Sequence, residues 1–347
     1  MNRGLRVSES RGLEETNHPN TKAQIDPSDL VTLWLILLGS FTVVLLGTAL
    51  ENPVMRHNEI SKMERHSTYG ELKKVVVRRP DDDFAVAVPD DWNYTATPNL
   101  PVAQSEHDRL TEVLRTVGSE VIYHDEDLQG RADSVFVFDP VLITGRGAIA
   151  LRMGKALRSG EEAALAKKVE SLGYPVIGAL TEPATVEGGD LLWLDDRTLA
   201  AGRGFRTNAE GIVQLRRILK GLDIQLEAFD LPYLSGPRAC LHLLSLISIL
   251  DRNLAVVYPP LMPVPLWEEL ERREFEIVEV PEPEFATMGP NVLALGPRRC
   301  LALEGNPITR ERLEAAGCEV FTYRGRELSL KAEGGPTCLT LPLQRDA

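Results

Sequence analysis

The chain has 347 residues, an apolar fraction of 43% and a formal net charge of −13 at pH 7. This length and apolar content are typical of one large α/β unit with a real core. The negative charge argues against a nucleic-acid-binding protein, which needs a basic surface. It suits a cationic small substrate, although an acidic surface that only aids solubility is the more common explanation.

The four cysteines indicate neither a metal site nor a disulfide framework. None forms a CxxC pair, and no histidine lies at zinc-ligand spacing from Cys240, Cys300, Cys318 or Cys338. Four thiols in a chain of this length are typical of free thiols in a reducing compartment. The sequence therefore predicts no metal and no cofactor.

The N-terminal region differs from the rest of the chain. Residues 1–29 are typical of a disordered tail, and residues 30–50 contain no charged side chain. A helix of that length spans roughly the 30 Å hydrocarbon core of a membrane. We therefore predict a transmembrane helix at 30–50 and a linker at 51–68. Lys and Arg are slightly more frequent after the helix than before it, which predicts that the following domain lies in the cytoplasm. A core helix, or translation that starts at Met55 or Met63, are the alternatives.

Strands and helices alternate from residue 69 to residue 347, which we interpret as one catalytic domain. Residues 73–79 predict a strand, and residues 105–118 predict a helix capped by Ser105. Residues 133–147 predict a hairpin whose two apolar strands are broken at Asp139-Pro140. Residues 160–173 predict a helix that ends at Gly173, and the same order of elements then recurs.

The recurrence has a period of about 50 residues. Strands that follow helices begin near residues 118, 173, 222, 274 and 317, with separations of 55, 49, 52 and 43. Such periods are typical of repeat architectures. Because five α/β units of this size can close into a ring, the expected fold class is α/β, a five-bladed αβ propeller.

A further strand is predicted after each of these five strands, and its first residue is polar or small. The five positions are Asp133, Gly189, His242, Asn291 and Cys338. If the repeats close around a pseudo-fivefold axis, equivalent positions meet at that axis. We therefore expect these side chains to face one pocket, although Asp133 and Cys338 lie 205 residues apart.

A thiol and an imidazole at one pocket can perform nucleophilic catalysis. A nearby cationic histidine raises the thiolate fraction of a cysteine, which makes Cys338 and His242 a candidate pair. The imidazole needs an acceptor that orients it, and Glu187, which precedes two glycines, is the candidate. A buried histidine bonded to one backbone carbonyl is the alternative for His242.

Two aspartates fit the recognition of a guanidinium group. Asp133 and Asp139 are six residues apart, so they point the same way on an extended strand, and carboxylates bind a guanidinium through paired N–H···O bonds. A turn at Asp139 and a capping role for Asp133 are the alternatives. Arg158 and Arg206 are either ordinary surface arginines or the partners of a substrate carboxylate.

The combined residues resemble the pentein superfamily, and most closely its dimethylarginine dimethylaminohydrolases. The resemblance runs from about residue 69 to the C-terminus. It is carried by the motifs ADSVFVFDP, EGGDLL, GFRTN, CLHL and GGPTC, which contain Asp133, Asp139, Glu187, Arg206, His242 and Cys338.

This resemblance implies a five-bladed αβ propeller and a role for each candidate residue. Cys338 would be the nucleophile, His242 the general acid and base, and Glu187 its orienting partner. Asp133 and Asp139 would grip the guanidinium, while Arg158 and Arg206 would bind the substrate carboxylate. The reaction would pass through a covalent thiouronium and release a ureido product such as citrulline.

Two positions depart from the family pattern. Phe138 stands where the family usually has a glutamate, which puts the choice of guanidino substrate in doubt. Leu244, two residues after His242, replaces the aspartate of arginine deiminases and amidinotransferases and argues against those branches. An amidinotransferase, a non-catalytic binding protein on the same fold, and a homodimer of this chain remain open alternatives.

Overall fold

A computed structural model describes residues 67–238 and 241–346. These residues belong to one compact unit, Met55–Ala347. The predicted tail at 1–29, the predicted transmembrane helix at 30–50 and the linker up to residue 66 lie outside the described residues. Across the described ranges, none of the helices combines the length and the apolar character that a membrane span requires.

The described residues form five three-stranded sheets with one common plan. In each sheet the middle strand is antiparallel to one neighbour and parallel to the other. The sheets, written in spatial order, are β15 (Leu341–Asp346), β1 (Glu71–Val77) and β2 (Glu120–Tyr123); β3 (Val141–Thr144), β4 (Gly147–Ala150) and β5 (Val176–Ala179); β6 (Leu191–Trp193), β7 (Thr198–Arg203) and β8 (Gln225–Asp230); β9 (Ile247–Asp251), β10 (Leu254–Val257) and β11 (Glu276–Glu279); β12 (Leu293–Gly296), β13 (Arg299–Leu303) and β14 (Glu319–Tyr323).

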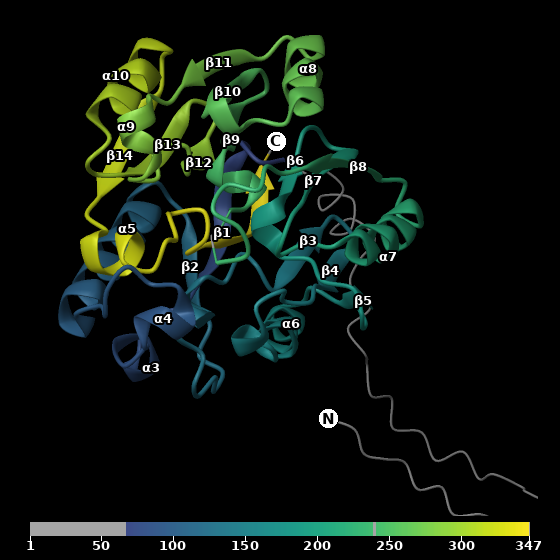
Figure 1. The fold of residues 1–347 in the computed structure, drawn as a ribbon, viewed down its shortest axis with the longest axis vertical. Helices are drawn as coiled ribbons and strands as arrows, with labels where there is room; N and C mark the ends of the chain where they lie inside the picture. The colour runs from purple at the N-terminus through teal and green to yellow at the C-terminus, as the bar shows by residue number, and fades with distance from the viewer. Residues whose placement is uncertain (1–66, 239–240, 347) are drawn as a thin grey trace, which may run out of the picture. The chain divides into compact units, whose positions relative to one another are not determined.

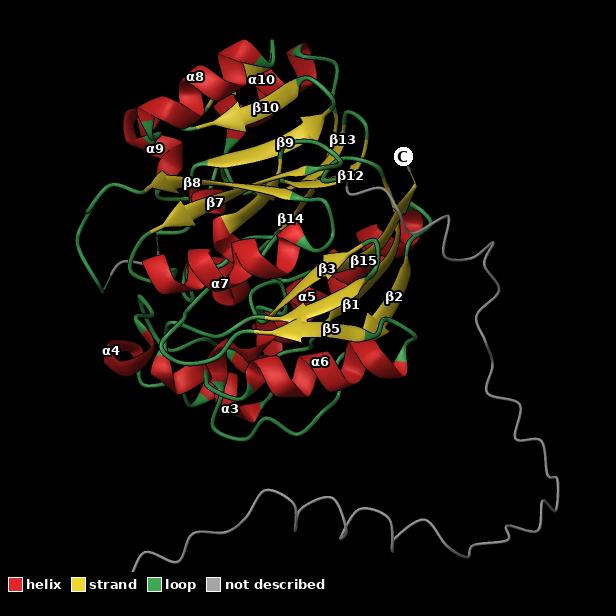
Figure 2. Cartoon of the chain, turned by 90° about the vertical axis from the view of Figure 1, so that its right-hand side faces the viewer, coloured by secondary structure: helices red, strands yellow, loops and turns green. Residues whose placement is uncertain are grey.

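A helix connects the two parallel strands of every sheet, as parallel pairing requires a crossover. These helices are α5 (Leu100–Thr116), α6 (Glu161–Ser171), α7 (Ala209–Lys220), α8 (Val264–Arg272) and α10 (Pro307–Ala315). They lie toward the periphery of the described unit, and the strands lie inward (Figures 1 and 2). Shorter helices are α3 (Asp82–Ala85), α4 (Pro89–Trp92) and α9 (Glu282–Phe285).

The two ends of the described chain meet in one sheet. β15 pairs antiparallel with β1, so that Glu71 lies opposite Asp346 and Val76 lies opposite Leu341. The first sheet is therefore completed by the last strand of the chain. All five predicted strands that follow helices are confirmed as β2, β5, β8, β11 and β14.

The crossover helix α7 buries an apolar stripe against its sheet. In α7, Ile212, Leu215 and Leu219 recur at helical spacing and are at most 4% exposed. Burying each such side chain stabilises the fold by roughly 1.5–3 kcal/mol. The helix begins at the Asn208 cap, whose side chain accepts a hydrogen bond from Gly211 N. Spacing and cap together explain why this segment is a helix.

Two sequence-based predictions of local structure are wrong. The helix predicted from Ser105 begins at Leu100, because the Asn99 side chain caps it by accepting from Val102 N. Residues 133–139 are not a strand: Ala132–Val135 form a 3-10 helix, and the hairpin consists of β3 and β4. Phe136 N bonds back to Asp133 O within this turn, so the apolar run is buried without joining a ladder.

The same correction applies to the other repeat positions. Gly189 lies in the 3-10 helix Gly188–Asp190, and His242 caps the 3-10 helix Leu243–Ser245. Asn291 and Cys338 lie in the turn or loop segments that precede β12 and β15. Each of the five positions thus lies before the first strand of a sheet and does not open that strand.

Candidate active site

Four of the five repeat positions line one cavity of about 510 Å³. Asp133, His242, Asn291 and Cys338 face it, together with Asp139, Lys155, Arg158 and Arg206. The predicted convergence of Asp133 with Cys338 is therefore confirmed. The fifth position, Gly189, is not among the lining residues. Its backbone lies against two of them, His242 and Asp139.

A glycine is required at position 189 because two side chains approach its backbone. A Cβ built there would lie 2.4 Å from His242 Nδ1 and 3.0 Å from Asp139 Oδ1. The backbone N–H of Gly189 also donates to Asp139 Oδ1 at 2.8 Å. The imidazole of His242 and the carboxylate of Asp139 thus both pack against the position that a side chain at 189 would occupy.

The thiol of Cys338 is partly buried and contacts an amide. Asn291 Nδ2 donates to Cys338 Sγ at 3.4 Å, and Asn291 Oδ1 accepts from Thr337 N at 3.1 Å. Gly335 allows this contact, because a Cβ there would lie 2.4 Å from Asn291 Oδ1. The amide therefore binds both the sulfur and the turn that carries it. Cys338, Cys300 and Cys318 form no disulfide in the described part of the chain, and Cys240 lies outside it.

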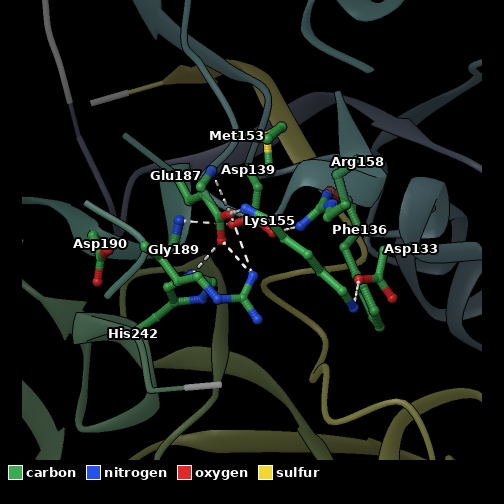
Figure 3. A network of polar contacts seen from close by, with 12 residues as sticks. Asp133, Phe136, Asp139, Met153, Lys155, Arg158, Glu187, Gly189, Asp190 and His242 are labelled. Carbon is green, nitrogen blue, oxygen red and sulfur yellow. Dashed lines mark hydrogen bonds and ion pairs between the residues drawn. The ribbon is translucent and has the colours of Figure 1, made fainter. Parts of the chain in front are cut away.

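Glu187 is a fully buried carboxylate that contacts the imidazole of His242. The distance from His242 Nε2 to Glu187 Oε2 is 2.8 Å, and Glu187 is 0% exposed (Figure 3). Arg206 NH1 lies 3.1 Å from Oε2, and Gly154 N donates to Oε1 at 2.9 Å. Burial alone would raise the pKa of Glu187, but Arg206 and His242 hold it well below its usual range. An ionised carboxylate in this position can stabilise an imidazolium.

The other ring nitrogen of His242, Nδ1, lies against the backbone of Gly189, where a Cβ would meet it at 2.4 Å. The turn after His242 is held by its backbone: Ser245 N donates to the carbonyl of His242 at 3.0 Å, and His242 N donates to Ser245 Oγ at 3.2 Å.

Asp190 is a buried residue of the site to which the sequence analysis gave no role. Its Oδ1 accepts from the backbone N–H of Leu243 at 3.0 Å, directly after His242. Burial raises the pKa of Asp190 to about 6, against the lowering effect of His242 and Thr207. Its place in the EGGD motif is the sequence feature that could have identified it. The hydrogen bond from Leu243 N shows that Asp190 holds the turn that carries His242.

Asp133 is bonded to groups of the protein itself. Its Oδ1 accepts from Tyr94 OH at 2.9 Å. Its Oδ2 accepts from Lys155 Nζ at 2.6 Å, a contact that Figure 3 shows. Lys155 was missed by the sequence analysis, and no local pattern distinguishes it from a surface lysine. Only the fold brings its ammonium to this carboxylate.

Asp139 and Arg158 pair with each other at the cavity wall. Arg158 NH1 donates to Asp139 Oδ2 at 2.6 Å, and its Nε and NH2 donate to Glu161 Oε2 at 3.0 and 2.8 Å. Burial raises the pKa of Glu161 to about 7 in spite of Arg158. Arg158 is 2% exposed and Arg206 is 7% exposed, so the surface-arginine alternative is wrong for both.

Phe138 does not line this cavity. It lines a second cavity of about 380 Å³, against Val141 and Leu244. The family glutamate position is therefore directed away from the candidate site. Within the described residues, no group of three or more His, Cys, Asp and Glu side chains is arranged to hold a metal ion.

Comparison with known proteins places the chain in a family. The sequence model described as N,N dimethylarginine dimethylhydrolase, eukaryotic, matches residues 81–345. The N(G),N(G)-dimethylarginine dimethylaminohydrolase of Streptomyces coelicolor is 32% identical over 273 residues, which cover 78% of this chain and 97% of that protein. The protein of the same name from Pseudomonas aeruginosa is 28% identical over 275 residues, covering 78% of this chain and 99% of that protein.

Solved structures agree with this placement. A Pseudomonas aeruginosa dimethylarginine dimethylaminohydrolase mutant complexed with citrulline is similar with a TM-score of 0.66 and 27% identity, covering 78% of this chain and 99% of that one. An amidinotransferase from Microseira wollei, at 18% identity and a TM-score of 0.68, covers 82% of this chain and 98% of its own and shares the α/β fold. The chain belongs to the N,N-dimethylarginine dimethylhydrolase family, within the pentein superfamily.

Proposed function

We propose that this chain is an amidine hydrolase that cleaves a C–N bond of an arginine-like guanidino compound and releases an amine and a ureido product such as citrulline. The observation that carries the proposal is one cavity lined by the thiol of Cys338 and by His242, whose imidazole contacts the buried carboxylate of Glu187. The named activity of the relatives supports the same reaction class.

In the first half of the reaction, the Cys338 thiolate attacks the guanidinium carbon. A C–S bond forms, and a C–N bond breaks as protonated His242 transfers its proton to the departing amine. The ionised Glu187 stabilises the imidazolium before transfer. A thiouronium then links the substrate to Cys338.

In the second half, neutral His242 takes a proton from water, and the resulting hydroxide attacks the thiouronium carbon. The C–S bond breaks, Cys338 leaves as thiolate, and the added hydroxyl loses its proton to solvent, which leaves the ureido C=O. The nitrogen that moves these protons is Nδ1, because Nε2 is bonded to Glu187.

The lining of the cavity supports a substrate-binding role for three further residues. Asp133 and Asp139 are the carboxylates for a substrate cation, and Arg206 binds a substrate carboxylate at the cavity. Arg158 already donates to Asp139 and to Glu161. We therefore assign Arg158 the role of holding Asp139 in place. A substrate carboxylate would bind Arg158 only if one of these hydrogen bonds broke.

The enzyme assay uses the full-length protein with arginine, dimethylarginine and agmatine, and measures ureido product and released amine in equal amounts. Cys338→Ser should abolish product formation, while Cys318→Ser, a change outside the cavity, should leave it intact. Wild-type turnover in the Cys338→Ser variant would remove the covalent mechanism. Adding glycine as an acceptor amine tests the transferase alternative, which requires amidino transfer to glycine in place of ureido product.

We also propose that the five sheets close into a five-bladed αβ propeller around the cavity. The common strand plan, the β15–β1 pairing and the four repeat positions at one cavity support it. An experimental structure in which one of the five sheets lies apart from this ring contradicts the closure.

Membrane attachment through residues 30–50, with the catalytic domain in the cytoplasm, and a homodimer are further proposals. Attachment rests on the uncharged run alone. The full-length protein should pellet with membranes and resist extraction by carbonate; recovery in the soluble fraction with an N-terminus at Met55 or Met63 contradicts it. Light scattering of the purified protein measures whether two copies associate.

A further inference from the structure

The second cavity adjoins the turns that carry the candidate active site. Its volume of about 380 Å³ is in the range of small-molecule sites. Leu244 lines both cavities. Three other residues that line the second cavity are sequence neighbours of active-site residues: Phe138 of Asp139, Gly188 of Glu187 and Thr337 of Cys338. The candidate mechanism uses none of the residues that line this second cavity.

All five sheets contribute to the wall of this cavity. In each case the contribution comes from the strand that is antiparallel to the middle strand of its sheet. The wall includes Val141 of β3, Leu191 of β6, Ser248 of β9, Leu293 of β12 and Leu343 of β15. Four of these five residues are apolar, so the wall favours an apolar ligand.

Hydroxyl groups at the wall are already bonded to the protein. Thr68 Oγ1, Thr144 Oγ1 and Ser248 Oγ each donate to a backbone carbonyl, at 3.0, 2.7 and 2.8 Å. A hydroxyl has one proton to donate. These three side chains therefore have no hydrogen-bond donor left for a ligand.

Arg345 is the one charged side chain among the described residues that line the cavity. It lies on β15 and is partly buried. Its NH1 donates to the carbonyls of Gly70 and Ala294 at 2.7 and 2.9 Å, while its Nε and NH2 bond to no described residue. Within the described part of the chain, no carboxylate forms an ion pair with it, and burial lowers its pKa to about 9. The guanidinium is thus still charged at pH 7, without a counter-charge.

The charge and the wall together define the chemistry of a matching ligand. A carboxylate accepts two parallel N–H bonds from one guanidinium, and Nε and NH2 of Arg345 are such a pair of donors. An apolar chain attached to that carboxylate would leave water for the apolar wall, which is favourable. A neutral ligand would leave the buried charge without a partner.

We propose that the second cavity is a ligand site for an apolar monocarboxylate such as a medium-chain fatty acid. The carboxylate binds Arg345, and the chain lies along the strands of the wall. This site is separate from the candidate active site, and the inference does not rest on the proposed hydrolase function.

Calorimetry on the full-length protein tests the site with octanoate, butanoate and 1-octanol. Octanoate should bind with a stoichiometry of one. Each CH₂ between butanoate and octanoate should lower the Kd roughly fourfold, because each is buried against the apolar wall. The neutral 1-octanol has the same chain without the charge and should bind at least ~10-fold more weakly than octanoate.

Two variants locate the ligand. Arg345→Met should raise the Kd for octanoate at least ~10-fold and leave that for 1-octanol nearly unchanged. Arg216→Met is the matched control, because its guanidinium also donates to a backbone carbonyl, that of Leu226, but lines neither cavity. Ile143→Trp fills the cavity and keeps Arg345, so it should abolish octanoate binding. A thermal melt checks folding, and Ile143→Trp decides the test if Arg345→Met unfolds.

Several results would overturn the inference. These are no octanoate binding by the wild-type protein, equal affinity for octanoate and 1-octanol, and unchanged octanoate binding in a folded Arg345→Met protein. Binding that persists in Ile143→Trp also contradicts it and places octanoate elsewhere, for example at Arg206 in the active site. Cys338→Ser should bind octanoate as the wild type does, so the result is independent of any hydrolase activity.

Discussion

The carboxylate of Glu187 lies between the imidazole of His242, at 2.8 Å, and the guanidinium of Arg206, at 3.1 Å. One buried carboxylate thus contacts both an imidazole and a guanidinium. Arg206 offsets the cost of burying the carboxylate, and the carboxylate can then stabilise the protonated imidazole.

Glu187→Gln should lower kcat at least ~100-fold at neutral pH, because the imidazolium loses its buried counter-charge while the shape of the side chain is kept. The change is measured as the rate of ureido product formation at saturating substrate. Glu182→Gln, at a carboxylate that is 81% exposed and pairs with Arg152, serves as the matched control. Equal rates in the two variants would show that Glu187 is not needed for proton transfer.

Gly189→Ala should reduce kcat strongly with little loss of folded protein. The added methyl lies where His242 Nδ1 and Asp139 Oδ1 already stand, so the imidazole must move. The control is Gly204→Ala, where the nearest atom would lie at an ordinary 3.4 Å. Both proteins are compared in steady-state rate and thermal melting. Full activity in Gly189→Ala contradicts the tight placement of the imidazole.

Arg158→Met should destabilise the protein by about 3–5 kcal/mol, because Asp139 and Glu161 are left buried without their counter-charge. Urea unfolding at pH 7 measures the loss. Arg197→Met breaks an exposed pair with Asp223 and should cost no more than about 1 kcal/mol. If Arg158→Met is as stable as the control and instead shows only a raised KM, Arg158 binds substrate and does not hold the wall.

The free energy of unfolding should fall on acidification because of two buried histidines. Burial lowers the pKa of His107 and of His124 to about 4 from the ordinary 6.5, and no partner of their ring nitrogens is found among the described residues. The unfolded chain therefore takes up protons first. Their stabilising contribution is complete above pH 6.5 and is lost as the pH falls toward 4.

For His107 the full loss is roughly 3 kcal/mol, given a shift of about 2.5 pKa units. Urea unfolding of wild type and His107→Phe at pH 7 and pH 4.5 measures it. The variant should lose less stability between these two pH values, since phenylalanine does not titrate. An identical pH dependence in both proteins would mean that His107 is not buried in its neutral form.

The amino-acid sequence predicted those elements of the fold that depend on a local pattern of residues. The five strands after helices were predictable because burial on one face imposes a period on each segment, and the repeat length places them near 50 residues apart. The helix end at Gly173 was also predictable, since its φ of +91° favours glycine. The prediction of a strand at 133–139 was wrong, because a buried strand and a buried turn can have the same run of apolar residues in the sequence.

The candidate active site likewise combines residues that the sequence identified with ion pairs that only the fold forms. The sequence by itself determined which residues could react. Cys338 and His242 stand at equivalent points of the repeat, and Glu187 precedes the glycine pair that contains a third such point. Only the tertiary structure decided the charge partners, namely Lys155 for Asp133 and Arg158 for Asp139. An ion pair depends on the distance between segments that the fold brings together and on their burial, and neither quantity is encoded in local spacing.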